Sequence, residues 1–241
     1  MDHGDFSTLR IDLHAHTHYS PDGAISPQRF VERARASGLN RIAVTDHGTI
    51  EGALRARELA PDMVVIGEEI RCHCHAELIG LFLRERIPMY LPLESVVERI
   101  HDQGGIIYAP HPYAYAWRPL ARARRVLAVA DMVEAYNSRA FLPSWNRAAS
   151  RAARLRHLPA GAGSDAHFPG EIGQAYTEMP GFEGALDFLA AARLARPVGV
   201  SGSGPSMHVA SAGLKASRVM RNVARSLTVR PQPGRPAAAR R

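Results

Sequence analysis

Short apolar runs alternate with longer amphipathic segments along most of the 241-residue chain. The runs are rich in Ile, Val, Leu and Ala, a composition typical of buried strands. They predict strands at 9–15, 41–46, 63–71, 76–83, 105–110, 131–136 and 159–165. Strand, helix and strand follow one another over about 200 residues, which favours repeated βα units with a mainly parallel sheet, either a barrel or a doubly wound sheet.

Helical periodicity separates several of these runs. In the segment 26–38, Ser26 is a suitable N-cap, Pro27 suits the first helical position, and Phe30, Val31 and Ala34 share one face. Further helices are predicted at 93–105, 142–157 and 183–195. After Pro197, the sequence "GVSGSGPS" predicts a flexible linker, followed by an amphipathic helix over 207–229. That helix is expected to pack on the body or lie on its surface, with membrane contact as the alternative.

Composition indicates a globular protein, because 46% of residues are hydrophobic and 22% are charged. The chain contains no apolar run long enough for a membrane span, and the N-terminus lacks the apolar core of a signal peptide, so we expect a cytoplasmic protein. The net charge of +7 is uneven: residues 1–187 hold 20 Lys and Arg against 23 Asp and Glu, whereas residues 188–241 hold 10 Lys and Arg and no acid. The basic character therefore belongs to the C-terminal end, where residues 230–241 are expected to be disordered.

Only two cysteines are present, Cys72 and Cys74 in "RCHCH". Alternate positions of one strand rarely reach disulfide geometry, so no bridge is expected between them. A variable hairpin tip between two strands is favoured for residues 72–75, and a separate zinc or redox site is the alternative.

Histidines and carboxylates gather at the ends of the predicted strands. In an extended strand, Asp12, His14 and His16 point to one side. Later strands end in companions of the same kind: Asp46 and His47, Glu68 and Glu69, His111, and Asp165 and His167. The C-terminal strand ends of a parallel α/β fold meet at one edge, and imidazole with carboxylate suits zinc, manganese or iron.

The motifs "DLHAHTHYSPDG", "TDHG", "GEEI", "APHP", "EAYN" and "GSDAH" resemble, in order, those of the polymerase and histidinol phosphatase (PHP) superfamily of metal-dependent phosphoesterases. The resemblance covers roughly residues 9–185. It implies a distorted TIM-like barrel of seven βα units holding up to three metal ions. The expected organisation is a catalytic barrel at 1–200, a linker and amphipathic basic helix at 201–229, and a disordered basic tail at 230–241.

The resemblance also implies a set of ligands for each ion. His14, His16, Glu69 and Asp165 would hold the first, and Glu69 would bridge to a second that also takes His111. Asp22, His47 and His167 would hold the third. Where the family commonly has another histidine, this chain has Glu77. Glu77 is interpreted as an oxygen ligand, and a weaker, more manganese-like second site is the alternative.

Clustered divalent ions suit phosphate ester hydrolysis, with a metal-bound hydroxide as the nucleophile and no covalent intermediate. The catalytic set would be His14, His16, Glu69, His111, Asp165 and His167. Arg118, Arg139, Asn137 and His18 are candidate contacts for a phosphorylated substrate, with surface charge, strand capping and solvent exposure as the ordinary interpretations. His18 and His167 are candidate proton donors to the leaving group.

Neighbouring acids are expected to have supporting roles rather than to bind metal. Asp12 and Asp46 either orient imidazoles or bond to backbone, and Glu68 is expected in a salt bridge.

The favoured function is hydrolysis of a small-molecule or nucleotide phosphomonoester. Alternatives are a 5′ to 3′ exonuclease or nucleoside bisphosphate phosphatase acting on nucleic-acid ends, and a non-catalytic, metal-stabilised scaffold. An amidohydrolase is disfavoured, because its binuclear form usually has a carboxylated lysine in the middle of the barrel. The only lysine here, Lys215, lies beyond the predicted barrel.

Overall fold

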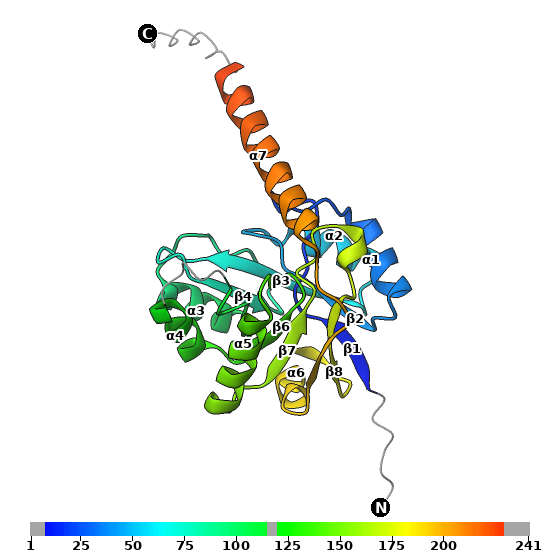
Figure 1. Ribbon diagram of the computed structural model, residues 1–241, viewed down its shortest axis with the longest axis vertical. Helices are drawn as coiled ribbons and strands as arrows, with labels where there is room; N and C mark the ends of the chain where they lie inside the picture. Colours follow the sequence, from blue (N-terminus) through cyan, green and yellow to red (C-terminus); the bar gives the residue numbers. More distant parts are fainter. Residues whose placement is uncertain (1–7, 115–119, 229–241) are drawn as a thin grey trace, which may run out of the picture.

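Nine strands form one sheet that curves into a nearly closed barrel in the computed structural model, which describes residues 8–114 and 120–228 (Figure 1). They are β1 (Leu9–Asp12), β2 (Arg41–Val44), β3 (Val64–Arg71), β4 (Glu77–Leu81), β5 (Ile106–Ala109), β6 (Met132–Asn137), β7 (Ala160–Gly163), β8 (Ala175–Met179) and β9 (Arg196–Gly199). The order across the sheet is β7-β6-β5-β4-β3-β2-β1-β8-β9. The Leu13 N–H donates to the Ala162 carbonyl at 3.3 Å, which draws β7 towards β1. The predicted α/β barrel is confirmed.

The sheet is mixed rather than mainly parallel as predicted. Among the described strands, β1, β2 and β3 run parallel to one another, as do β5, β6 and β7. The strand β4 is antiparallel to both β3 and β5, because only a short turn joins it to β3. The antiparallel pair β8 and β9 was missed, and Gly199, expected in the linker, pairs with Ala175.

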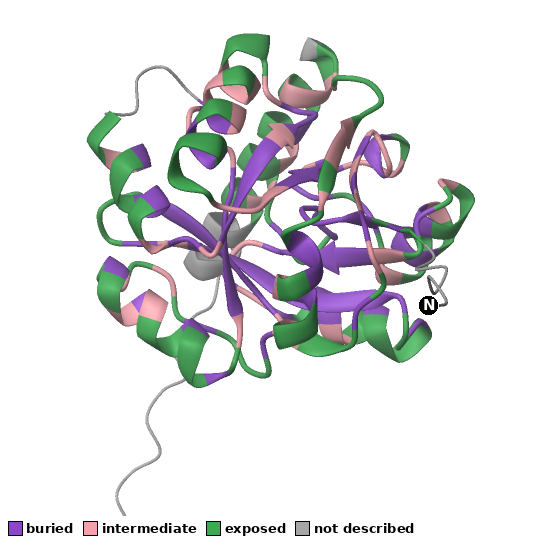
Figure 2. Ribbon diagram, turned by 90° about the horizontal axis from the view of Figure 1, so that it is seen from below, coloured by how far each residue is buried: buried purple, intermediate pink, exposed green. Residues whose placement is uncertain are grey.

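Helices surround the sheet, and all but the last direct their buried faces towards the strands (Figure 2). They are α1 (Pro27–Ala36), α2 (Glu51–Leu59), α3 (Leu93–Asp102), α4 (Leu120–Val129), α5 (Pro143–Arg156), α6 (Gly184–Ala192) and α7 (Pro205–Thr228), with a short 3-10 turn, η1 (Pro169–Glu171). In α1, the Ser26 hydroxyl caps the Arg29 N–H at 3.3 Å, and Phe30, Val31 and Ala34 are buried as predicted. The helix α2 was missed because its buried face consists of Gly52, Ala53 and Ala56, which are too small to mark an apolar stripe.

Two apolar clusters lie on opposite faces of the strands. Along β2, Ile42 and Val44 pack under the outer helices, whereas Ala43 belongs to a second cluster with Ile11 and Tyr108. Because side chains alternate along a strand, each strand contributes to both layers. The second cluster includes Phe182 and Phe188, whose rings meet edge to face at 5.0 Å. The apolar interior leaves the C-terminal strand ends free for polar groups.

The predicted C-terminal helix is present as α7. Its N-terminal part lies against the barrel, and its remainder extends away from it (Figure 1). Within the described ranges, no helix combines the length and apolar character that a membrane span requires. The predicted disordered tail, residues 230–241, falls outside the described residues.

Candidate metal centre

Five histidines and three carboxylates from different strand ends converge on one site. His14 and His16 follow β1, His47 follows β2, Glu69 lies on β3, His111 follows β5, and Asp165 and His167 follow β7. Asp22 comes from the loop between β1 and α1. Six of these residues line a cavity of about 230 Å³, and His14 and His16 are fully buried beside it. Segments up to 153 residues apart in sequence thus supply one polar centre.

The His14 and His16 rings form the centre of the cluster. Their Nε2 atoms are 3.0 Å apart. Glu69 Oε2 lies 3.4 Å from each of these nitrogens, and Asp165 Oδ1 lies 3.5 Å from His14 Nε2 and 3.3 Å from His16 Nε2. Two imidazole nitrogens and two carboxylate oxygens therefore face one point.

Hydrogen bonds to the opposite ring nitrogens set the orientation of these histidines. His14 Nδ1 is 3.0 Å from Glu134 Oε1, and His16 Nδ1 is 3.0 Å from the Ser20 hydroxyl, which itself donates to Asp46. The carboxylate of Glu134 can only accept, so His14 carries a proton on Nδ1 and directs Nε2 inward. Two inward Nε2 lone pairs at this separation repel unless a cation lies near them. The donor set fits a divalent metal ion.

Neighbouring charges shift the pKa values of His14 and His16 in opposite directions. Although burial opposes protonation, Asp165 and Glu134 raise the pKa of His14 well above its ordinary value. Burial and the charge of His167 lower the pKa of the adjacent His16 to about 3. The carboxylates around His14 thus favour positive charge at this point, which a bound divalent ion would supply.

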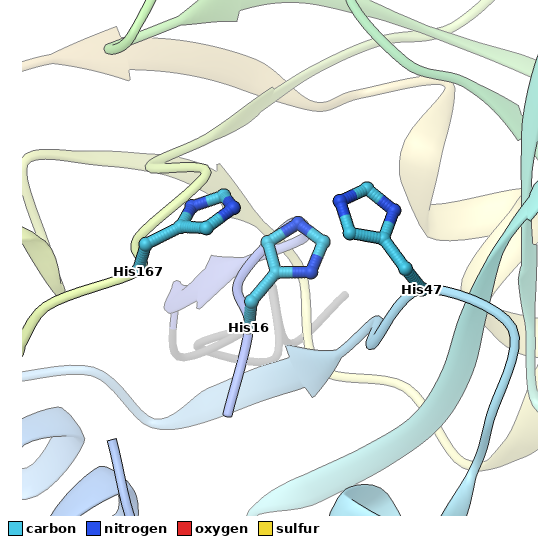
Figure 3. A group of neighbouring side chains, drawn as sticks. All are labelled: His16, His47 and His167. Atoms are coloured by element: carbon cyan, nitrogen blue, oxygen red, sulfur yellow. The ribbon is translucent and has the colours of Figure 1, made fainter. Parts of the chain in front are cut away.

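A second group of rings lies beside the first. His16, His47 and His167 face one another (Figure 3), and each offers a nitrogen within 4.8 Å of the others. The His167 Nδ1 donates to the Asp165 carbonyl at 2.7 Å, so its Nε2 faces Asp22 Oδ1 at 3.5 Å. The His47 Nε2 lies 3.6 Å from Asp22 Oδ2. Burial would raise the pKa of Asp22, but His167 and His47 hold it well below its ordinary value.

A third group joins His14, Glu69 and His111, which also offer ligand atoms within 4.8 Å of one another. The His111 Nε2 is 3.4 Å from Glu69 Oε1, while Glu69 Oε2 faces His14, His16 and, at 3.1 Å, His47 Nδ1. Both oxygens of Glu69 are therefore directed at imidazoles. The structure brings together the residues predicted for all three ions, and their assignment to particular ions is a proposal.

The backbone is unusual at this edge. His111 and Asp165 have positive φ angles of 27° and 53°. Such conformations are unfavourable for residues other than glycine and collect at functional sites. At Gly163, a Cβ would lie 2.4 Å from both His14 Cβ and Glu134 Oε1. Glycine at this position lets β7 approach the oriented His14.

Glu77 lies on the cavity wall, where it is engaged by guanidinium groups. Arg71 Nη2 is 2.6 Å from Glu77 Oε1, and Arg122 Nη2 is 3.0 Å from Oε2. The carboxylate lines the same cavity as Glu69 and His111. Its proposed role as an oxygen ligand would have to coexist with these two ion pairs.

The predicted substrate contacts differ in their placement. Arg139 is buried and binds both oxygens of Glu171, at 2.7 and 2.9 Å, so its guanidinium serves the cavity wall. The Asn137 amide donates to Glu134 and Asp165 at 3.0 and 3.2 Å. His18 is exposed and stacks on Tyr19 outside the cavity. Arg118 falls outside the described residues.

The neighbouring acids mostly support the backbone. Asp12 accepts from the N–H groups of His14 and Ser164 rather than from an imidazole, and burial raises its pKa to about 7. Asp46 reaches His16 through Ser20, which is the orienting role considered for it. The predicted salt bridge of Glu68 is replaced by a 2.8 Å hydrogen bond from the Ile87 N–H.

The "CHCH" stretch forms the turn between β3 and β4, as the hairpin prediction expected. Both cysteines are free, and burial raises the pKa of Cys72 to about 12, whereas Cys74 is exposed. Among the described residues, neither belongs to a group that can hold a metal ion.

Sequence reasoning missed Glu134 and Lys215. The buried Glu134 also accepts the His111 N–H at 2.7 Å and so fixes two histidine segments. Its signal was an acid within the otherwise apolar strand β6. Lys215 Nζ lies 3.3 Å from Asp22 Oδ2, but a lysine on a basic helix carries no such signal.

Comparison with protein families places this centre in a known context. The model for the PHP domain matches residues 12–134, and a PHP-associated model matches residues 143–197. The chain belongs to the PHP family. Among its relatives, the uncharacterised MJ1587 of Methanocaldococcus jannaschii is 40% identical over 44% of this chain and 69% of its own length. MJ0417 of the same organism is 32% identical over 71% of this chain and 70% of its own length.

A relative with a named activity matches less of the PHP chain. A 5′-3′ exoribonuclease of Haemophilus influenzae is 41% identical over 26% of this chain and 24% of its own length.

Solved structures share the PHP fold. A two-domain protein of Bacteroides vulgatus, described as containing a predicted PHP-like metal-dependent phosphoesterase, is 20% identical with a TM-score of 0.65, covering 80% of this chain and 66% of that one. Endonuclease Q, solved with a 27-mer duplex carrying an abasic lesion, is 14% identical with a TM-score of 0.58, covering 77% and 56%. The PHP family and the clustered ligands support divalent metal binding and a phosphoesterase or nuclease type of function.

Proposed function

We propose that this PHP protein hydrolyses a phosphomonoester of a small molecule or nucleotide with two or three divalent ions, which manganese, zinc or iron would supply. The observation that carries the proposal is the pair of His14 and His16 Nε2 atoms, 3.0 Å apart and flanked by Glu69 and Asp165. Bound divalent ions in such a cluster lower the pKa of water, polarise phosphoryl oxygens and hold attacking and leaving oxygens in line. We retain the predicted cytoplasmic location, to which the exposed free thiol of Cys74 is suited.

The chain's own residues would orient and surround the substrate. Glu134 and Ser20 hold the His14 and His16 rings with Nε2 inward. Arg71 on the cavity wall supplies positive charge for a phosphate group. The cavity of about 230 Å³ adjoins an apolar pocket of about 280 Å³ lined by Phe141 and Trp145, among others, which suits an aromatic or apolar leaving group.

Hydrolysis of p-nitrophenyl phosphate by the purified chain with manganese tests this proposal. We expect turnover that chelator abolishes and that His14→Ala and Asp165→Ala reduce by several orders of magnitude. The control His101→Ala changes a half-exposed histidine on α3, remote from the cavity, and should leave turnover unchanged. Metal-dependent thermal stabilisation without hydrolysis of any phosphoester would instead favour the non-catalytic scaffold.

A cleft beside the centre favours a second candidate function, action on nucleic-acid ends. It measures about 970 Å³ and contains Arg147, Arg151 and Arg154 from one side of α5. Asn137, Ala140 and Phe141 line both this cleft and the apolar pocket. Arginines that track a phosphate backbone beside aromatic rings are typical of single-strand binding. The three arginines, together with Phe141, therefore support this second candidate.

The two functions separate in a paired assay with a 5′-phosphorylated oligonucleotide and p-nitrophenyl phosphate. If the strand lies in the arginine cleft, Arg151→Glu lowers oligonucleotide cleavage and leaves p-nitrophenyl phosphate hydrolysis unchanged. Arg125→Glu, which changes an exposed arginine on α4, is the matched control. Equal effects of the two variants on oligonucleotide cleavage would reject the cleft as a strand path.

A further inference from the structure

The cavity receives one wall from a segment beyond both family matches. His208, Ser211, Ala212 and Lys215 of α7 line it, whereas the PHP-associated match ends at residue 197. Lys215 is the only lysine in the chain. Its Nζ lies 3.3 Å from Asp22 Oδ2, and its side chain is 47% exposed. A single ammonium group therefore stands at the rim of the metal centre.

Polar contacts on both sides fix Lys215 in that place. One turn earlier, the Ser211 hydroxyl accepts from Arg139 Nη2 at 3.0 Å. One turn later, Arg218 Nη1 donates to the carbonyls of His18 and Ser20 in the loop that carries Asp22. Residues 211, 215 and 218 share one helical face, so the docked side of α7 presents Lys215 to the cavity.

Lys215 shares its carboxylate partner with two imidazoles of the centre. Asp22 also faces His47 Nε2 at 3.6 Å and His167 Nε2 at 3.5 Å. A divalent ion held by these three residues would repel the ammonium, because both cations would then compete for one carboxylate. An anion carrying two negative charges between them removes that repulsion, and an ammonium is a well-suited point charge for phosphate.

We propose that Lys215 is a substrate-binding residue, with which α7 closes a phosphate pocket over the metal centre. On binding, its ammonium leaves Asp22 for a non-bridging phosphate oxygen. This inference rests on the proposed phosphoesterase function and adds a selectivity to it. The pocket takes a terminal phosphate dianion in preference to a phosphodiester, which offers one negative charge fewer.

Amine labelling tests phosphate contact without relying on turnover. Lys215 and the α-amino group are the amines of the chain, so acetylation by acetic anhydride, read by mass spectrometry, follows Lys215 with an internal reference. With manganese present, inorganic phosphate at ten times its Kd should slow labelling of Lys215 about tenfold and leave the α-amino group unchanged. Equal labelling rates with and without saturating phosphate would overturn the proposal.

Substitution separates substrate binding from support of the helix. Lys215→Met should raise KM for p-nitrophenyl phosphate about tenfold while kcat changes much less, since a uniform binding contact is lost. Lys215→Arg should recover part of this loss. Without phosphate, Lys215→Met should bind manganese as tightly as the unchanged protein or more tightly, as measured by calorimetry. Arg221→Met, which alters an exposed arginine that donates to Ser217 of the same helix, is the control and should leave KM unchanged.

The outcomes distinguish this inference from the proposed function. Hydrolysis by the unchanged protein, together with unaltered KM in Lys215→Met and unprotected labelling, rejects the role of Lys215 and leaves phosphoester hydrolysis intact. Protection of Lys215 by phosphate in a chain that hydrolyses no phosphoester supports the pocket and rejects the enzyme.

Discussion

The barrel edge and the helix α7 both face the same cavity, but they hold their side chains in different ways. On the barrel, His14 is fully buried and its ring is fixed by the buried Glu134. On α7, Lys215 is about half exposed and reaches the cavity through one ion pair. Buried, charge-assisted hydrogen bonds are strong, whereas exposed ion pairs contribute little. The proposed metal ligands are therefore held rigidly, and the wall proposed to select the substrate is held weakly.

Arg139 joins the two regions and offers the sharpest test of the contrast. It is buried, pairs with the buried Glu171 and donates to Ser211 of α7. Arg139→Met leaves the Glu171 carboxylate buried without this partner, so we expect a loss of about 3–5 kcal/mol in the free energy of unfolding, measured by urea denaturation. Arg124→Met, on the exposed side of α4, should cost far less. A stable Arg139→Met protein with a raised KM would instead restore the predicted role of Arg139 as a phosphate contact.

Glu134 tests the rigid side alone. Glu134→Gln keeps the size of the side chain but replaces the carboxylate that receives His14 Nδ1 at 3.0 Å. Because such partners orient metal-binding imidazoles, manganese affinity and kcat/KM should each fall about 10- to 100-fold. Calorimetric titration and p-nitrophenyl phosphate assays measure the two quantities. The control Glu58→Gln alters an exposed acid on α2, and equal manganese affinity in both variants would contradict the orienting role.

The same contrast explains how much the sequence could predict. The ligands from His14 to His167 follow short motifs at strand ends, and a barrel brings strand ends together, so their meeting was predictable. Glu134 could have been suspected, because an acid within an apolar strand requires a partner. The partners of Glu77 could not be predicted from the sequence, because Arg71 and Arg122 reach it only through the pairing of β3 with β4 and the packing of α4.

Two further gaps have simple physical causes. The strand β8 alternates buried and half-buried residues instead of forming a continuous apolar run, so it did not stand out. The place of Lys215 depends on how α7 docks through Ser211 and Arg218, contacts that leave no periodic pattern in the sequence.

The smallest effect is expected from loosening α7 without touching the cavity. Arg218 donates to the carbonyls of His18 and Ser20, and its removal takes these bonds from the docked face of the helix. Arg218→Ala should lower the free energy of unfolding by no more than about 1 kcal/mol, because partly exposed bonds are exchanged for bonds to water. Hydrogen exchange should nevertheless quicken at the start of α7 while β5 and β6 stay protected, since local opening need not involve the core. Faster exchange spreading into those strands would show that α7 and the barrel open as one unit, which would remove the distinction between a rigid centre and a weakly held wall.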